Sequence, residues 1–276
     1  MSAAGAQPHV VLDRVSYRFP DSAVQAIEAI SLSAAAGETV VLLGPSGCGK
    51  TTVLRLIAGL LTPDSGTVRL AGHAPKVGQG TAMVFQSFRL LPWKTTRDNI
   101  AFALHHLPAD ERAERVKRYI ALVGLERFAD AYPGQLSGGM KQRVALARAL
   151  ASEPDVLLMD EPFASLDAQS RELMQMEMGN LTAARSAVSP ATTFFVTHSV
   201  DEALMLADRI VLLSPRPGRV AEVLEVALPK QRWQADTRQL PEFIAMRQHL
   251  WDRLREMVLA DPNSDFYGRM PKGDAA

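Results

Sequence analysis

Short apolar runs alternate along the chain with longer stretches in which apolar residues recur every three or four positions. Short runs rich in β-branched residues predict buried strands, whereas the longer spacing predicts amphipathic helices. Strands that alternate with helices in this way imply an α/β fold, with a mostly parallel sheet built from βαβ units and flanking helices. We expect strands at 9–12, 30–34, 39–43, 67–70, 81–85, 156–159, 193–196, 210–213 and 220–226, and helices at 50–59, 108–123, 138–151, 168–184, 201–207 and 241–259.

The segment from 95 to 151 departs from this alternation, because it reads as helical throughout. Thr95 begins a capping-box pattern that ends at Asp98, and Ser137 stands where the N-cap of a further helix is expected. A helical block between two strands predicts an all-helical subdomain, at about 87–153, inserted in the α/β core. Near the start of the chain, a turn at Pro20, Asp21 and Ser22 separates the first two strands.

The last expected helix, at 241–259, predicts a short extension at 221–276 after a main domain at 9–220. A helix with an apolar stripe normally packs that stripe on the core, and a dedicated partner-binding face is the alternative. The apolar residues at helical spacing are Phe243, Ile244, Leu250, Trp251, Leu254, Met257 and Val258.

Composition excludes several classes of protein. Thirty basic residues balance thirty acidic ones, so a broad electrostatic surface for nucleic acid is not expected. A single cysteine cannot form an intrachain disulfide. The longest stretch without Lys, Arg, Asp or Glu, 186–200, is too short and too polar to span a bilayer, and the first residues do not resemble a signal peptide. We therefore expect a soluble, cytoplasmic, neutral chain.

A glycine-rich loop follows the expected strand 39–43 and precedes the expected helix. It matches the pattern G-x-x-x-x-G-K-[ST], whose backbone N–H groups surround a phosphate of a nucleotide. Lys50 supplies positive charge to the β- and γ-phosphates of ATP, and the Thr51 hydroxyl ligates Mg²⁺. Cys48 either is a reactive thiol or is needed there only because it is small, and the second alternative is favoured. The predicted phosphate-binding residues are Gly44, Pro45, Ser46, Gly47, Cys48, Gly49, Lys50, Thr51 and Thr52.

Two adjacent carboxylates, Asp160 and Glu161, end the buried strand 156–159. Strand alternation predicts that their side chains point in opposite directions, which suits two separate roles. Asp160 would hold Mg²⁺ through a water, and Glu161 would polarise the water that attacks the phosphate. An acidic pair that only caps the next element is the alternative, and the glycine-rich loop makes the catalytic role the stronger prediction.

The sequence Leu136-Ser-Gly-Gly-Met140 resembles the signature of ATP-binding-cassette (ABC) proteins. Glycines allow a close approach to phosphate, and a helix N-terminus attracts an anion. The resemblance implies that two copies of the chain stack head to tail, so that Ser137, Gly138 and Gly139 contact the ATP held by the second copy. Met140 replaces the usual glutamine of the motif, which leaves open any role for a side-chain amide there.

Other segments follow the ABC order. By this resemblance, Gln86 reaches Mg²⁺ and the attacking water, and His198 contacts the γ-phosphate. Ala164-Ser-Leu-Asp167 is similar to the D-loop at the dimer interface. Phe19 matches the aromatic residue that stacks on adenine, with Tyr17 as the rival. The resemblance also implies a P-loop ATPase core with antiparallel N-terminal strands and an inserted helical signature subdomain.

The segments 87–93, 98–100 and 215–219 resemble the nitrate/sulfonate/taurine importer ATPases. In that family the region of Trp93 lies beside the groove that receives the permease, although simple packing of the tryptophan is an alternative. We therefore expect an ATP-hydrolysing importer subunit, peripheral at the cytoplasmic face of the inner (plasma) membrane, with a permease and, indirectly, a periplasmic or lipoprotein substrate-binding protein as partners. An ATP-driven dimerising module with a non-transport or regulatory role is the alternative. A P-loop kinase would leave the signature unexplained, and the transported substrate is not encoded in this chain.

Overall fold

The computed structural model describes residues 9–20, 23–164, 166–186, 191–229, 232 and 236–268. Asp21 and Ser22 of the expected turn, and Ser165 of the D-loop segment, lie outside the described residues. The described chain forms two compact units. The first contains the residues up to Pro75 and those from Val196 onward, and the second runs from Lys76 to Phe195.

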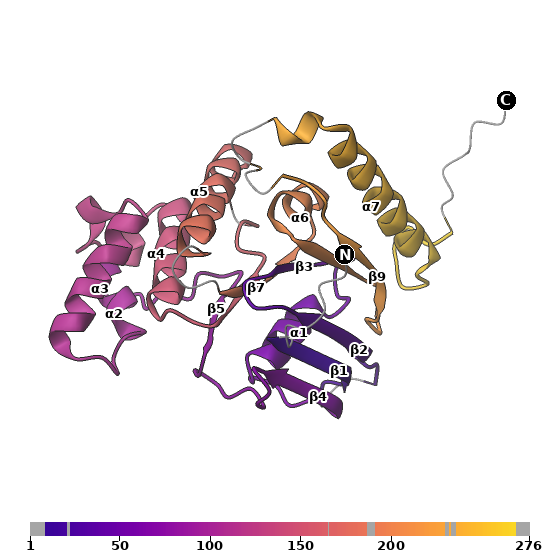
Figure 1. Cartoon of the computed structure of the whole chain (residues 1–276), viewed down its shortest axis with the longest axis horizontal. Coiled ribbons are helices and arrows are strands. Elements are labelled where there is room, and N and C mark those ends of the chain that lie inside the picture. Colours follow the sequence, from indigo (N-terminus) through magenta and orange to yellow (C-terminus); the bar gives the residue numbers. More distant parts are fainter. Residues whose placement is uncertain are drawn as a thin grey trace. The chain divides into compact units, whose positions relative to one another are not determined.

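The first unit contains a three-stranded antiparallel sheet in the order β2-β1-β4 (Figure 1). Its strands are β1 (Val10–Tyr17), β2 (Ile27–Ala34) and β4 (Ser65–Leu70). β1 extends well beyond its expected end at Leu12. The sequence expectation was wrong there because Arg14 adopts a φ of 47° and the register shifts between Leu12 and Val15, so the alternation breaks while the strand continues.

The same unit holds a second set of strands that position the phosphate loop. β3 (Thr39–Leu43) pairs in parallel with β8 (Arg209–Leu213), which pairs antiparallel with β9 (Val220–Glu225). The residues from Val40 to Leu43 are 0% exposed, as expected for a parallel strand covered on both faces. β3 leads through the glycine-rich loop into α1 (Lys50–Ile57), so that the helix begins directly after the loop.

Two further helices complete the first unit. α6 (Val200–Leu206) contacts α7 (Pro241–Ala260), and a short 3-10 helix, η3 (Thr237–Gln239), precedes α7 (Figure 1). Phe243 and Leu250 on α7 are fully buried, whereas Ile244 and Trp251 are 46% and 50% exposed. The expected apolar stripe is therefore narrower than predicted, because each exposed residue lies one position, about 100° around the helix, from a buried one.

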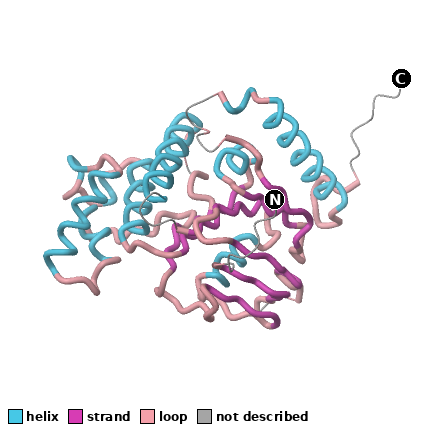
Figure 2. Tube along the Cα trace, viewed as in Figure 1, coloured by secondary structure: helices cyan, strands magenta, loops and turns pink. Residues whose placement is uncertain are grey.

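The second unit joins three strands to a helical block. β5 (Thr81–Val84) pairs in parallel with β6 (Val156–Asp160), and β7 (Thr192–Thr197), whose last two residues belong to the first unit, follows in the strand order. Between β5 and β6 the regular secondary structure consists of helices joined by loops (Figure 2). Its elements are α2 (Thr96–Phe102), α3 (Ala109–Leu122), η1 (Glu126–Phe128), η2 (Pro133–Gln135) and α4 (Gly138–Ala151), and α5 (Ala168–Ser186) follows β6.

The predicted helix caps are present in this unit. The Thr95 hydroxyl accepts a hydrogen bond from the backbone N–H of Asp98 at 3.1 Å, and the Ser137 hydroxyl accepts one from Met140 N–H at 3.3 Å. Each cap satisfies one of the N–H groups that a helix leaves unpaired at its start. Within the described residues, no helix combines the length and apolarity needed to cross a bilayer.

Candidate functional site

The phosphate loop is curled around the side chain of Lys50, at the start of α1. The ammonium donates hydrogen bonds to the carbonyl oxygens of Gly44 at 2.7 Å and Pro45 at 2.9 Å. Gly49 has a φ of 97°, and a Cβ there would meet Ile27 at 2.4 Å, so both conformation and packing require glycine. Gly47 has a φ of 77° and lies exposed, which leaves its backbone accessible to a phosphate.

Cys48 lies inside this loop and is 0% exposed. Burial raises the pKa of its thiol, although the neighbouring Lys50 opposes the shift. The Lys50 ammonium contacts its Sγ atom at 3.8 Å. A buried thiol with a raised pKa is a poor nucleophile, so the structure favours the interpretation that this position needs a small residue.

A loop between β8 and β9 supports the phosphate loop within the same unit. A Cβ on Gly218 would lie 2.0 Å from the backbone oxygen of Cys48, so only glycine allows the two backbones to approach this closely. Gly218 also exchanges backbone hydrogen bonds with Ala26 and Glu28, at 3.0 and 2.9 Å. The sequence marked 215–219 as a family segment, but its role in supporting the phosphate loop depends on contacts between distant parts of the chain.

The two predicted carboxylates lie at the end of β6 in the second unit. Asp160 is the last residue of the strand and is 7% exposed. Glu161 has a φ of 45°, so the strand ends before it and strand alternation does not set its direction. The prediction that strand alternation sets the directions of both carboxylates was therefore wrong for Glu161. The Gln86 amide donates to the Glu161 carboxylate at 3.5 Å, which brings two of the predicted catalytic residues together.

The segment after Gln86 is held by a residue that the sequence analysis missed. Arg148 of α4 donates to the carbonyl oxygens of Arg89 at 2.7 Å and Phe88 at 3.1 Å. Burial lowers the pKa of the Arg148 guanidinium. Because α4 begins at the signature residues, Arg148 ties the signature helix to the Gln86 segment. The sequence shows only an arginine in an expected helix, which does not identify a partner.

The turn that carries Trp93 is held by Asn99, which is 0% exposed. The Asn99 amide N–H₂ donates to the carbonyl oxygens of Leu91, Lys94 and Thr95, at 3.2, 3.0 and 2.9 Å, and its oxygen accepts from the Leu91 N–H at 2.8 Å. Trp93 itself is 71% exposed. The packing alternative for Trp93 therefore does not hold among the described residues, since the turn presents its indole to solvent.

The signature residues line a hollow of about 370 Å³ in the second unit. Ser137, Gly138 and Gly139 share it with Leu166 and Asp167 of the D-loop segment. Neither glycine has a positive φ, and a Cβ on either would meet no described atom within 4 Å. Folding of this chain therefore does not require glycine at these two positions, which points to close approach by a ligand or another molecule.

His198 and Phe19 belong to the first unit. His198 is exposed, directly after β7 and before the N-cap of α6. Phe19 is half-buried and its ring lies 5.1 Å from that of Tyr17 in a T-shaped arrangement. Tyr17 is 8% exposed. The greater exposure of Phe19 favours it over Tyr17 as the ring on which a base stacks.

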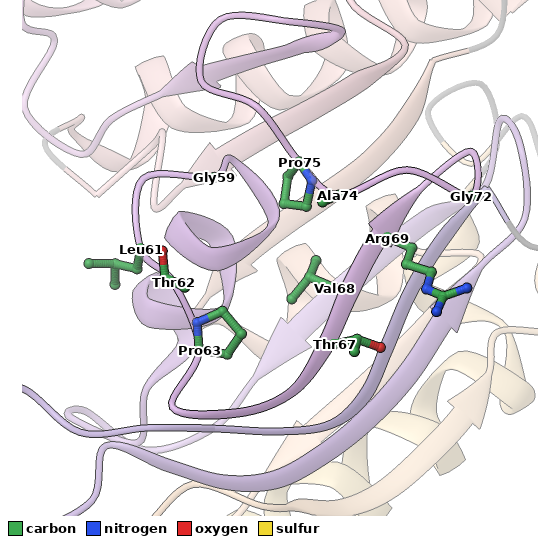
Figure 3. Close-up of a pocket in the computed structure, with 10 residues that line it drawn as sticks. All are labelled: Gly59, Leu61, Thr62, Pro63, Thr67, Val68, Arg69, Gly72, Ala74 and Pro75. Carbon is green, nitrogen blue, oxygen red and sulfur yellow. The ribbon is translucent and has the colours of Figure 1, made fainter.

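A larger pocket of about 660 Å³ lies in the first unit between the end of α1 and β4 (Figure 3). It is lined mainly by apolar residues and threonines, and its one charged side chain, Arg69, extends away from Val68 and Pro63. Sites for small ligands combine an apolar lining with convergent polar groups. This pocket lacks them, and it borders the end of α1 rather than its beginning, so it is not the phosphate site.

The residues predicted for Mg²⁺ are Thr51, Gln86 and Asp160, which offer hydroxyl, amide and carboxylate oxygens. Oxygen ligands with few carboxylates suit Mg²⁺, which retains several waters and binds through substrate phosphates. Among the described residues no group of three or more His, Cys, Asp or Glu side chains could hold a metal. The residue types present therefore fit a phosphate-bound Mg²⁺ rather than a metal held by protein side chains alone.

The fold and the phosphate loop define a P-loop ATPase. The chain belongs to the ABC transporter family, whose model, described as "ABC transporter", matches residues 27–164. Its hydrolysis of ATP is the activity of that family, and its fold is that of ABC ATPase cassettes.

Curated relatives cover most of the chain. An "Uncharacterized ABC transporter ATP-binding protein" of Methanocaldococcus jannaschii is 46% identical over 88% of this chain and 89% of its own length. A "Taurine import ATP-binding protein TauB" of Chromobacterium violaceum is 47% identical over 86% of this chain and 92% of its own length. Among solved structures, the ATP-binding cassette MJ0796, in a dimeric post-hydrolysis state bound to ADP and Pi, has a TM-score of 0.68 and 30% identity over 79% of this chain and 98% of its own.

Proposed function

We propose that this chain is the ATP-hydrolysing subunit of an ABC importer, which powers uptake of a small anion such as nitrate, a sulfonate or taurine through a separate permease. The observation that carries the proposal is the glycine pair at the start of α4, the exposed Gly138 and the half-buried Gly139, in a chain that already has a phosphate loop. Neither backbone conformation nor packing requires these glycines. A second helix N-terminus that can bind phosphate has a role if it contacts the nucleotide bound by a second copy of the chain.

In this proposal the chain's residues act mainly by positioning and by charge stabilisation. The Lys50 ammonium, which donates hydrogen bonds to the Gly44 and Pro45 carbonyls of the loop, binds the β- and γ-phosphates. His198 contacts the γ-phosphate. Thr51, Gln86 and Asp160 would hold Mg²⁺, which when bound neutralises charge on the phosphates. Glu161 accepts the proton of the attacking water, and Gln86, which donates to its carboxylate, holds that carboxylate in orientation.

The proposed assembly is a dimer with two ATP molecules between the copies. Ser137, Gly138 and Gly139 of each copy would contact the ATP bound by the phosphate loop of the other, with Leu166 and Asp167 beside them. The solved cassette with ADP and Pi is dimeric, which supports this arrangement. Phe19 would stack on the adenine.

Transport requires a membrane partner, and the exposed Trp93 on its Asn99-held turn is the proposed contact for the permease. The chain would then lie at the cytoplasmic face of the inner (plasma) membrane, and a periplasmic or lipoprotein substrate-binding protein would be an indirect partner. A relative named for taurine import supports an importer over the alternative, a dimerising module with a non-transport role. The substrate itself is selected by the permease and the binding protein.

The variant Glu161→Gln tests the catalytic assignment. Removing the base while keeping the shape should lower kcat by at least about a hundredfold, the lower end of the range for general-base catalysis. ATP should still bind, so gel filtration in ATP should show a stable dimer that wild type forms only transiently.

Glu126→Gln, an exposed glutamate of the same unit, is the matched control and should behave as wild type. Normal turnover by Glu161→Gln would refute the role of Glu161. A monomer in ATP that retains nucleotide binding would refute the dimer.

A further inference from the structure

The strand end that carries His198 is bonded to the first turn of α6. The Ser199 hydroxyl accepts a hydrogen bond from Glu202 N–H at 3.3 Å, and Ser199 N–H donates to the Thr197 hydroxyl at 2.9 Å. The Thr197 hydroxyl donates in turn to the Glu202 carboxylate. His198 is thus flanked on both sides by residues bonded to α6, and a shift of α6 would move the histidine with it.

α6 has only seven residues, too few to be stable as an isolated helix. Its position must therefore come from tertiary contacts, and much of that contact is supplied by the C-terminal extension. The C-terminal end of α6 is held by Arg232, which is 5% exposed. Its guanidinium donates to the carbonyl oxygens of Leu204 at 2.8 Å and Ala207 at 2.6 Å. A cation at a helix C-terminus satisfies carbonyls that have no partner in the helix and interacts favourably with the helix dipole.

Arg232 is itself held in place. Its Nε donates to the Pro229 carbonyl at 3.2 Å, and the Thr237 hydroxyl donates to the Arg232 carbonyl at 3.0 Å. Burial lowers the pKa of the Arg232 guanidinium, and nearby Asp208 partly offsets this. An arginine stays charged under these conditions. The Arg232 guanidinium therefore places a buried positive charge at the C-terminal end of α6.

The N-terminal turn of α6 is held by α7. Arg247 of α7 pairs with Asp201 at 3.8 Å, three residues beyond His198. Both side chains are partly exposed, so this pair is weaker than the buried Arg232 contact. The extension therefore holds both ends of α6, and α6 and α7 are in contact.

The extension is anchored independently of α6. On α7, His249 and Arg253 contact Glu222 of β9, at 2.6 and 3.1 Å, and the two partners lower the pKa of the Glu222 carboxyl against the opposing effect of burial. β9 pairs with β8, which pairs with β3, the strand that leads into the phosphate loop. The extension thus links α6 to the same strands that fix the phosphate loop.

We propose that the C-terminal extension positions His198 by fixing α6, and that Arg232 is the principal positioning residue. The inference rests on the proposed contact of His198 with the γ-phosphate and extends it to residues that contact no nucleotide. Loss of Arg232 should impair hydrolysis rather than ATP binding, because the hydrogen bonds by which Lys50 holds the Gly44 and Pro45 carbonyls of the phosphate loop do not involve α6.

The test compares the steady-state ATPase kinetics of Arg232→Met with those of wild type. We expect kcat to fall about tenfold with KM for ATP changed less than about twofold, since small displacements of a catalytic group have effects of this size or larger. Arg232→Lys, which keeps a charge and can reach one carbonyl at a time, should recover part of kcat. The control is Arg255→Met, an exposed arginine of the same extension whose ion pair is with Asp252 of α7 itself, and it should keep the wild-type kcat.

A double-mutant cycle with His198→Ala separates positioning from general destabilisation. If Arg232 acts through His198, then Arg232→Met should change the residual kcat of His198→Ala by less than about twofold. A tenfold loss in both backgrounds would overturn this inference alone. Wild-type turnover by His198→Ala would refute the proposed role of His198 and, with it, this inference.

Arg247→Glu provides a second variant if Arg232→Met does not fold. It places a carboxylate beside Asp201 on a partly exposed surface, where a substitution rarely prevents folding. We expect its kcat to fall about two- to fivefold, an effect that His198→Ala should again abolish. A folded Arg247→Glu with wild-type kcat would overturn the proposal.

Discussion

Lys50, Asn99, Arg148 and Arg232 share one arrangement: each directs polar N–H groups at backbone carbonyl oxygens of a loop or a helix end. Carbonyl groups in loops lack the partners that regular secondary structure supplies. Removing the Lys50 or the Arg232 side chain would leave buried carbonyls unpaired, at a cost of about 1–3 kcal/mol for each such group. Single residues thus give the loops around the proposed site their defined shape.

Cys48 allows a test at the scale of one residue, because it is the only cysteine in the chain. Burial raises its thiol pKa, so the thiolate is disfavoured in the folded state. At pH 8 we expect a maleimide to label the folded chain at least about a hundredfold more slowly than the chain in urea, because both access and thiolate fraction are reduced. Labelling kinetics followed by mass spectrometry provide the measurement.

The same shift predicts the sign of a pH effect on stability. Because the folded pKa lies above the unfolded one, the stabilising effect of the neutral thiol is complete below the unfolded value of about 8.5 and is lost as pH rises through the folded pKa. Urea unfolding of Cys48→Ser should lack this loss. Rapid labelling of the folded wild-type chain would show that the thiol is accessible and reactive.

At the scale of elements, some residues fix the backbone of the turn between β5 and α2, whereas another residue of that turn is exposed to solvent. Asn99 and Arg148 hold its backbone, while Trp93 extends into solvent. A side chain that is 71% exposed contributes little to the stability of the chain that carries it. Its proposed contribution is the contact with the permease.

We expect Trp93→Ala to reduce the fraction of the chain that sediments with native membranes at least about threefold, because loss of an aromatic contact at an interface typically costs 1 kcal/mol or more. The purified variant should fold and hydrolyse ATP. Phe102→Ala, which removes a 56% exposed aromatic residue from α2, is the matched control and should sediment as wild type does. Unchanged membrane association of Trp93→Ala would favour the non-transport alternative.

At the scale of the whole molecule, the predicted site residues divide between the two units. The phosphate loop and His198 belong to the first, and Gln86, Asp160, Glu161 and Ser137 belong to the second. A ligand that binds only the folded chain stabilises it by mass action. ATP should therefore raise the unfolding temperature of the whole protein.

At ATP concentrations about a hundredfold above Kd the expected stabilisation is about 2.7 kcal/mol, which corresponds to a rise in Tm of about 5–10 °C for a chain of this size. Lys50→Ala should abolish most of this rise, because it removes the charge that the loop holds for the phosphates. Thermal scans with and without ATP measure the shift, and Lys117→Ala, an exposed lysine of α3, serves as the control. An equal rise in Lys50→Ala would refute the phosphate-loop assignment.

The sequence by itself determined the features that depend on neighbours along the chain. The buried strand at Thr39–Leu43, the glycine-rich loop, and the caps at Thr95 and Ser137 were predicted, because each is encoded in a few consecutive residues. The P-loop ATPase class and the ABC family follow from such local patterns, and the family match confirms them. The placement of the remaining site residues around a nucleotide stays a prediction.

Only the tertiary structure decided which distant groups meet. Arg148 reaches a carbonyl 60 residues away, and Arg232 reaches carbonyls of α6 that are 28 and 25 residues away. A local pattern shows that such a residue is polar but not which partner satisfies it. The positive φ of Glu161 and the narrow buried face of α7 were likewise set by packing, because the surrounding fold fixes the backbone at a strand end and the sides of a helix that it covers.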